Sequence, residues 1–144
     1  MISLAAFKGF FDNVPTLIPG IKRVELITDE SEMNQVLPTV SPDEDPFLIV
    51  LVPSATSQGS EQNIFVENNL GLLYVLSKED NTSKHSIEIQ TDTQPLVEAL
   101  KLKMQEDKEN CGIFRNLDEA SFHTDPENKK FSGKCTGWSV SFRF

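Results

Sequence analysis

The sequence predicts a single α+β domain over residues 1–144, with a mostly antiparallel central sheet flanked by an N-terminal helix and a helix near residues 93–109. Three observations predict this class: an unbroken apolar run at residues 47–52, strict alternation of large and small or polar side chains at residues 137–144, and an apolar stripe at helical spacing in the second helix. A chain of 144 residues can bury a core without a metal or a disulfide.

The N-terminal segment, residues 3–14, predicts a short helix. Ser3 can cap it, and its apolar residues recur three and four positions apart. Pro15, Pro19 and Gly20 then end the helix.

A strand at residues 21–28 and a polar connection follow. The connection, residues 28–46, is stiffened by three prolines and has room for one turn of helix around residues 32–37. Residues 47–52 are too short for a typical helix and lie between two prolines, which favours a central strand buried on both faces. An aspartate at either of two positions in this strand should unfold the protein: Ile49 or Leu51.

Residues 54–63 have no apolar side chain larger than alanine, so they predict a loop or the tip of a protruding hairpin. Two strands are expected next, at residues 64–66 and 70–78, with Asn68-Asn69 as a bend between them and Gly71 as a bulge.

Residues 86–91 alternate between apolar and polar side chains and predict another strand. Asp92 or Thr93 can then cap the second helix, and Pro95 falls in its first turn, where a missing N–H costs nothing. Gly112 is the expected C-terminal stop.

The last part of the chain predicts two strands. Residues 113–124 hold one, anchored by Phe122, and residues 125–130 form a charged turn. In the final strand four large residues point one way, and because frayed tails are usually polar, this end is expected to be docked on the body: Trp138, Val140, Phe142 and Phe144.

Composition excludes several classes of protein. The longest apolar run is six residues, which excludes a membrane span, and 13 basic against 22 acidic residues, a net charge of −9, argue against a nucleic-acid reader. Two cysteines are too few for a disulfide scaffold. The N-terminus shows no export signal, so we expect a cytoplasmic protein with reduced cysteines.

The acidic residues are unevenly placed. No basic residue occurs between Arg23 and Lys78, and the residues between them hold nine acids, so the whole net charge lies in residues 24–77. This stretch is either an acidic surface that aids solubility, or one that repels nucleic acid or meets a basic partner.

No pattern predicts a metal, a cofactor or a catalytic nucleophile. The two histidines and two cysteines lack the close ligand pairs of zinc sites, and Asp43-Glu44-Asp45 lacks the spacing of a calcium loop, which favours a solvated acidic turn. Ser54 has no flanking glycines of a nucleophile elbow, and Cys111 is expected at the end of a helix, where the dipole does not activate a nucleophile. Trp138 could be a ligand platform but is more typical of a core or an interface.

The order of elements carries a family resemblance. The chain runs from an N-terminal helix through a strand, the buried strand FLIVLV, a long polar loop, the strand LGLLYVL and a helix to the closing strand GWSVSFRF. This order resembles the tail-terminator and head–tail joining (tail completion) proteins of tailed bacteriophages and prophages. The likeness covers nearly the whole chain as a pattern, and its most specific part is the terminal Gly-Trp strand.

The resemblance implies a virion structural protein without a catalytic site or cofactor. Such proteins form rings, usually of six copies, that cap the tail tube and dock the head connector, while DNA passes through without sequence reading. They are assembled in the host bacterial cytoplasm. The acidic stretch would then line the channel and the polar loop would be an arm that reaches a neighbour or the tube. The resulting candidate lumen and interaction residues are Asp43, Glu44, Asp45, Glu61, Trp138, Phe142 and Phe144.

Two other interpretations stay open. A small acidic stand-alone binding or inhibitor module that pairs with a basic protein would also be free of motifs. A small enzyme or ligand-binding domain would need a pocket that brings together His85, His123 or Trp138.

Overall fold

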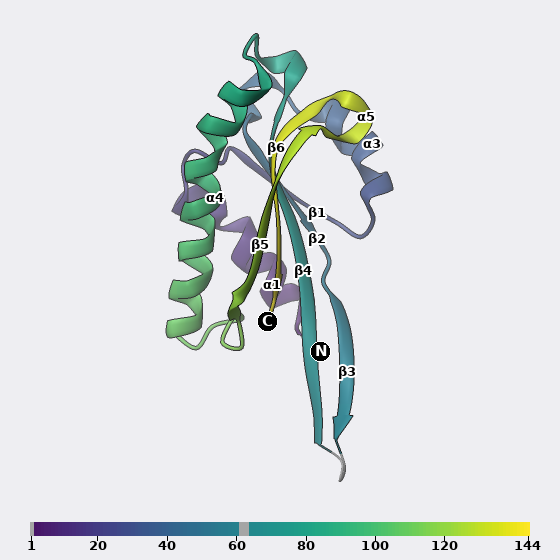
Figure 1. The fold of residues 1–144 in the computed structure, drawn as a ribbon, viewed down its shortest axis with the longest axis vertical. Helices are drawn as coiled ribbons and strands as arrows, with labels where there is room; N and C mark the ends of the chain where they lie inside the picture. The colour runs from purple at the N-terminus through teal and green to yellow at the C-terminus, as the bar shows by residue number, and fades with distance from the viewer. Residues whose placement is uncertain (1, 61–63) are drawn as a thin grey trace.

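The computed structural model describes residues 2–60 and 64–144 and shows an α+β fold built on one six-stranded sheet (Figure 1). The strand order is β1-β2-β4-β6-β5, and β3 pairs with β4 outside this path. Among the described strands only β1 and β2 pair in parallel, so the sheet is largely antiparallel, as the sequence predicts. The strands are β1 (Arg23–Ile27), β2 (Phe47–Leu51), β3 (Ser54–Ser60), β4 (Ile64–Lys78), β5 (Asp118–Lys129) and β6 (Cys135–Arg143).

The helices pack on one face of the sheet in the body of the molecule. They are α1 (Leu4–Asp12), α2 (Val14–Leu17) and α4 (Ser86–Glu109), and Figure 1 shows α4 lying along the strands. Phe7 and Phe11 of α1 and Met104 of α4 pack with the inward residues of the strands in a first apolar cluster. Ser3 caps α1 as predicted, with its side chain accepting a hydrogen bond from the Ala6 N–H. Pro15 does not end this helix but lies in the first turn of α2.

The opposite face is covered only in part. The connection between β1 and β2 holds short 3₁₀ turns and α3 (Met33–Val36), which matches the expected turn of helix. Met33, Leu37 and Val40 from this connection pack on Phe47 and Ile49 in a second apolar cluster. Strand β2 therefore contributes alternate residues to two cores, which confirms that it is buried on both faces.

The prediction of a strand at residues 86–91 is wrong, because these residues are the first turns of α4. His85 is extended, and its backbone N–H donates to the Glu88 carboxylate at 2.7 Å, a hydrogen bond that starts the helix. In a strand Ile87 and Ile89 would share a face, whereas Ile87 is 69% exposed and Ile89 only 2%. Pro95 consequently lies inside the helix, and neither Asp92 nor Thr93 caps it.

Two expected breaks in β4 are also absent from the described residues. Asn68 and Asn69 pair with Thr56 and Ala55 of β3, so the strand runs unbroken through the expected bend. Gly71 pairs regularly with Phe142, and a Cβ at this glycine would lie 2.3 Å from the Phe142 ring. The glycine is therefore required by close packing under an aromatic ring, and not by a bulge.

Three boundaries late in the chain differ from the prediction. Helix α4 ends at Glu109, and Cys111, not Gly112, has the left-handed backbone with φ 56°. The expected charged turn at residues 125–130 continues β5, which pairs with β6 as far as Glu127. The chain reverses instead in α5 (Lys130–Gly133), where three consecutive residues from Phe131 have positive φ.

The C-terminal strand confirms its predicted alternation. Val140, Phe142 and Phe144 are buried in the first cluster, and Ser141 and Arg143 point to the other face. Phe144 exchanges two backbone hydrogen bonds with Asn69, so this end is docked on β4 as expected.

Candidate functional site

The most distinctive feature of the molecule is a projecting hairpin, which Figure 1 shows extending beyond the body. We call its described residues, 54–60 and 64–69, the arm. Seven residue pairs join β3 to β4, from Ser54–Leu70 to Ser60–Ile64. At about 3.3 Å per residue, the 15 residues of β4 span about 50 Å, long enough to cross the body and continue into the arm. Residues 54–60 of the polar segment predicted as a loop or hairpin tip therefore form one strand of a hairpin, and residues 61–63 lie outside the described residues.

Beyond Asn69, which bonds to Phe144, both outer edges of the arm lack a strand partner among the residues that the structure describes. Strand β3 pairs only with β4, and β6 follows β4 only from Leu70 toward Lys78. An isolated two-stranded hairpin is marginal in water, and open edges attract other chains. The side chains from Ser54 to Ser57 are small or polar and are exposed. The arm therefore has the geometry of a segment that contacts another molecule.

The connection between β1 and β2, residues 28–46, holds six of the acids in the acidic stretch, and most of them serve its own structure. Asp29 accepts the Ser31 backbone N–H at 2.7 Å, which lowers the pKa of its carboxyl. Glu32 accepts the Thr28 backbone N–H. Glu30 accepts the Tyr74 hydroxyl, and burial together with this carboxylate raises the pKa of Tyr74. These contacts hold the connection against the second apolar cluster.

The three consecutive acids Asp43, Glu44 and Asp45 have different environments. Glu44 accepts the Ser41 backbone N–H and pairs with Arg23 at 3.3 Å, and both contacts lower the pKa of its carboxyl. Asp45 accepts the Lys78 backbone N–H at 2.8 Å and the Asn81 side-chain amide at 3.0 Å. Asp43 is exposed and accepts no hydrogen bond from any residue that the structure describes. It is thus the acid of this group that remains available to a partner.

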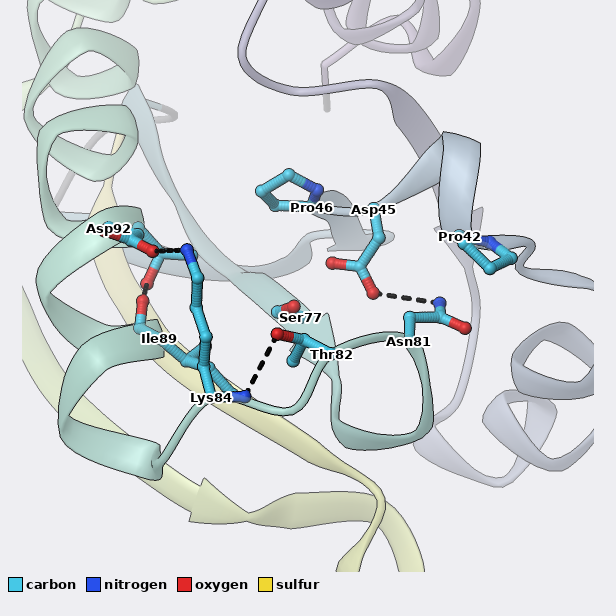
Figure 2. A pocket seen from close by; sticks show the side chains of 10 residues that line it. Pro42, Asp45, Pro46, Ser77, Asn81, Thr82, Lys84, Ile89 and Asp92 are labelled. Atoms are coloured by element: carbon cyan, nitrogen blue, oxygen red, sulfur yellow. Dashed lines mark hydrogen bonds and ion pairs between the residues drawn. The ribbon is translucent and has the colours of Figure 1, made fainter.

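A hollow of about 270 Å³ lies where the connection meets α4 (Figure 2). Asp45 and Pro46 form one wall, Ser77 and the Asn81–Thr82 turn the floor, and the first turns of α4 the other wall. Lys84 pairs with Asp92, which raises the pKa of the lysine, and Asp45 holds Asn81. The charged side chains of the hollow thus have partners within the chain, and Asp45 ties the acidic connection to the turn after β4.

The predicted aromatic candidates lie mostly inside the chain. Phe142 and Phe144 are 1% and 5% exposed and pack with Phe114, with ring centroids 5.9 and 5.1 Å apart. Both rings are therefore part of the core and are not available to a partner. Trp138 is half-buried, and its indole N–H donates to the Gln90 carbonyl at 2.9 Å. Glu61 lies outside the described residues.

The histidines and cysteines do not form a shared site. His85 precedes α4, and His123 is exposed and paired with Asp125 at 3.0 Å. Trp138 packs on the helix-covered face of the sheet, whereas His123 is paired in register with Ser141 on the other face. Within residues 2–60 and 64–144, no group of three histidine, cysteine or acidic side chains is placed to hold a metal ion. In the same residues, no helix is both long and apolar enough to cross a bilayer.

Comparison with known proteins gives no family assignment. No protein-family model matches the chain, and no curated protein matches it. A functional hypothesis therefore depends on the arm, on the acidic connection and on the order of elements.

Sequence reasoning missed one functional candidate, Arg143. The alternation of the last strand predicts that Arg143 lies on the face opposite Phe142 and Phe144. Only the register of β4 and β6 shows that it lies beside Leu70, at the base of the arm.

Proposed function

We propose that the protein is a virion structural subunit that assembles with copies of itself into a ring, and that this ring caps or joins a phage tail tube at the head–tail interface. The observation that carries the proposal is the arm. A hairpin with a polar strand β3 and outer edges that are open beyond Asn69 suits a contact with a neighbouring subunit or the tube.

The acidic connection supports the same role. DNA that passes through a ring must not adhere to its wall, and negative side chains repel the phosphate backbone. Asp29, Glu30 and Asp43 are exposed, and all three belong to the connection between β1 and β2. In this proposal they face the channel or a shared surface, the assembly takes place in the host bacterial cytoplasm, and the protein catalyses no reaction.

Shortening the arm tests the proposal directly. Thr56 and Asn68 are direct partners, so residues 57–67 can be replaced by a two-residue Asn-Gly turn that closes the hairpin there. The full chain should form rings by light scattering and electron microscopy, alone or on purified tail tubes. The shortened chain should keep its melting temperature and lose the rings.

Two results would contradict the proposal. A full chain that stays monomeric at every salt concentration, with tail tubes present, would exclude a ring. A stable one-to-one complex with a basic protein would instead support the stand-alone binding module, for which the exposed Asp43 and the net charge of −9 are suited.

A further inference from the structure

Two hollows meet at the base of the arm, on the sheet face that the β1–β2 connection leaves uncovered. One, of about 320 Å³, is lined by Thr56, Asn68, Asn69, Leu70 and Arg143. The other, of about 390 Å³, shares Leu70 and Arg143 and extends along β5 and β6. Leu70 is 51% exposed, whereas Leu76, on the same face of β4 but under the connection, is fully buried. We call this surface the Arg143 hollow.

Arg143 offers an unused cation in this hollow. Its backbone N–H donates to the Ser121 hydroxyl at 2.8 Å, but its guanidinium makes no hydrogen bond or ion pair with any described residue. Asp118, its register partner on β5, instead accepts the Ala120 backbone N–H. A guanidinium presents a planar fork of donors that matches a carboxylate, and Leu70 beside it offers an apolar contact.

The chain also carries a free carboxylate, at the end of the sheet that is remote from the arm. Asp43 is exposed and unpartnered, and the neighbouring Asp45 is tied to the backbone of Lys78. Arg143 is paired with Leu70, eight residues from Lys78 along β4. At about 3.3 Å per residue this separation is about 26 Å, so Asp43 of one copy cannot reach its own Arg143.

We propose that the Arg143 hollow of one copy binds the acidic connection of the next copy, with Asp43 paired to Arg143. The inference rests on the proposed ring, for which it names the contact between subunits. Because the two surfaces lie at opposite ends of β4, the contact is head-to-tail, and such contacts close into rings when the rotation between copies allows it.

Charge reversal tests this contact. Arg143→Asp and Asp43→Arg should each weaken association about 30-fold or more, as expected when one partner of an interfacial charge pair is lost. The double variant with both changes should assemble again. An equal mixture of the two single variants should also assemble, because every contact between unlike copies is complementary: the intact Asp43 meets the intact Arg143, and the two substituted side chains meet each other. Light scattering should then show large assemblies for the mixture and small species for either single variant alone.

Matched controls separate this effect from net charge. Arg115 and Asp80 are exposed and have no described partner for their side chains, so Arg115→Asp and Asp80→Arg repeat the charge changes elsewhere. Both controls should assemble like the unmodified chain, and all variants should keep its melting temperature. Rings that survive Arg143→Asp would overturn this inference and leave the ring proposal standing. An unmodified chain that stays monomeric, tail tubes included, would overturn both.

Discussion

The two cysteines show how position decides the chemistry of a side chain. Cys135 lies at the start of β6 inside the second apolar cluster, and burial raises the pKa of its thiol from the usual 9.0 to about 12. Cys111 follows α4, is exposed and holds the left-handed backbone that usually selects glycine. The Cys135 thiol is therefore unreactive in the folded chain, whereas the Cys111 thiol is accessible to reagents.

We predict that one thiol per chain reacts rapidly with a thiol reagent at pH 8 and that the second reacts only after unfolding. The Cys111→Ser variant should lose the fast phase, and Cys135→Ser should keep it. Mass spectrometry of the labelled peptides checks the assignment, and rapid labelling of Cys135 in the folded chain would contradict it.

The same pKa shift predicts a loss of stability at high pH. The unfolded Cys135 thiol ionises near pH 9.0 and the folded one near 12, so the unfolded state gains from ionisation as the pH rises between these values. The contribution is intact below about pH 9 and is lost above it. Urea unfolding of Cys135→Ala and the unmodified chain from pH 8 to 11 should show a shallower decline for the variant.

A local sequence pattern is sufficient to predict strand β2, whereas the start of helix α4 depends on packing against the sheet. The apolar run of β2 is long enough to show from the chain alone that both faces are buried. Helix α4 begins with a stretch whose alternation suits a strand, yet Thr91 and Thr93 donate their hydroxyls to the carbonyls of Ile87 and Ile89 within the helix. Packing of Ile89, Val97 and Leu100 against the sheet overrides the local pattern.

In β2 we predict unequal effects of a buried charge. Ile49 is fully buried in the second apolar cluster, so Ile49→Asp should unfold the chain, since an unpaired buried charge costs several kcal/mol against a total stability of about 5–15. Leu51 is only partly buried at the end of the strand, so Leu51→Asp should lower the melting temperature and still fold. Equal effects, measured by circular dichroism, would contradict the burial pattern.

In α4 we predict that Pro95→Ala stabilises the protein. Pro95 is exposed, lies in the helix interior and cannot donate a hydrogen bond to the Thr91 carbonyl. Alanine restores that bond, which should raise the free energy of unfolding by about 1–3 kcal/mol. The neighbouring exposed Gln94→Ala is the control and should change stability by less than about 0.5 kcal/mol. A destabilised Pro95→Ala variant would mean that the helix needs its proline.

The whole molecule combines a covered face, a half-covered face and a projecting arm. Its net charge of −9 repels copies of itself, and its acids are divided between those that hold the connection and those that face outward. The solvated acidic turn that the sequence favours for Asp43-Glu44-Asp45 implies that all three acids can be neutralised without unfolding the domain. The structure shows that Glu44 pairs with Arg23 and that Asp45 binds Lys78, so these two are structural.

We therefore expect the single and the triple substitution to differ. Asp43→Asn should leave the melting temperature unchanged. Changing Asp43, Glu44 and Asp45 together to Asn should lower the free energy of unfolding by about 1–3 kcal/mol, because charge-assisted hydrogen bonds are lost. Urea unfolding of both variants checks this.

Assembly of the unmodified chain should strengthen from low salt to about 0.15 M, where the Debye length is about 8 Å and the repulsion between acidic copies is screened. Light scattering across salt checks this, and assembly that weakens steadily with salt would contradict self-repulsion as the controlling term.

The sequence by itself determined the elements whose signal is local. The run in β2, the alternation in β6 and the Ser3 cap of α1 each depend on neighbouring residues, so composition and period were sufficient to predict them. The concentration of acids between residues 24 and 77 was likewise readable from the chain alone.

Only the tertiary structure decided the remaining features, because each depends on contacts between distant residues. The helical state of residues 86–91 follows from packing on the sheet, and the unbroken β4 follows from pairing with β3. Asp43 stays free because Arg23 and Lys78, which are far away in sequence, bind the neighbouring Glu44 and Asp45. Arg143 became a candidate only through its register with Leu70, since periodicity shows which face a side chain occupies but not what lies beside it.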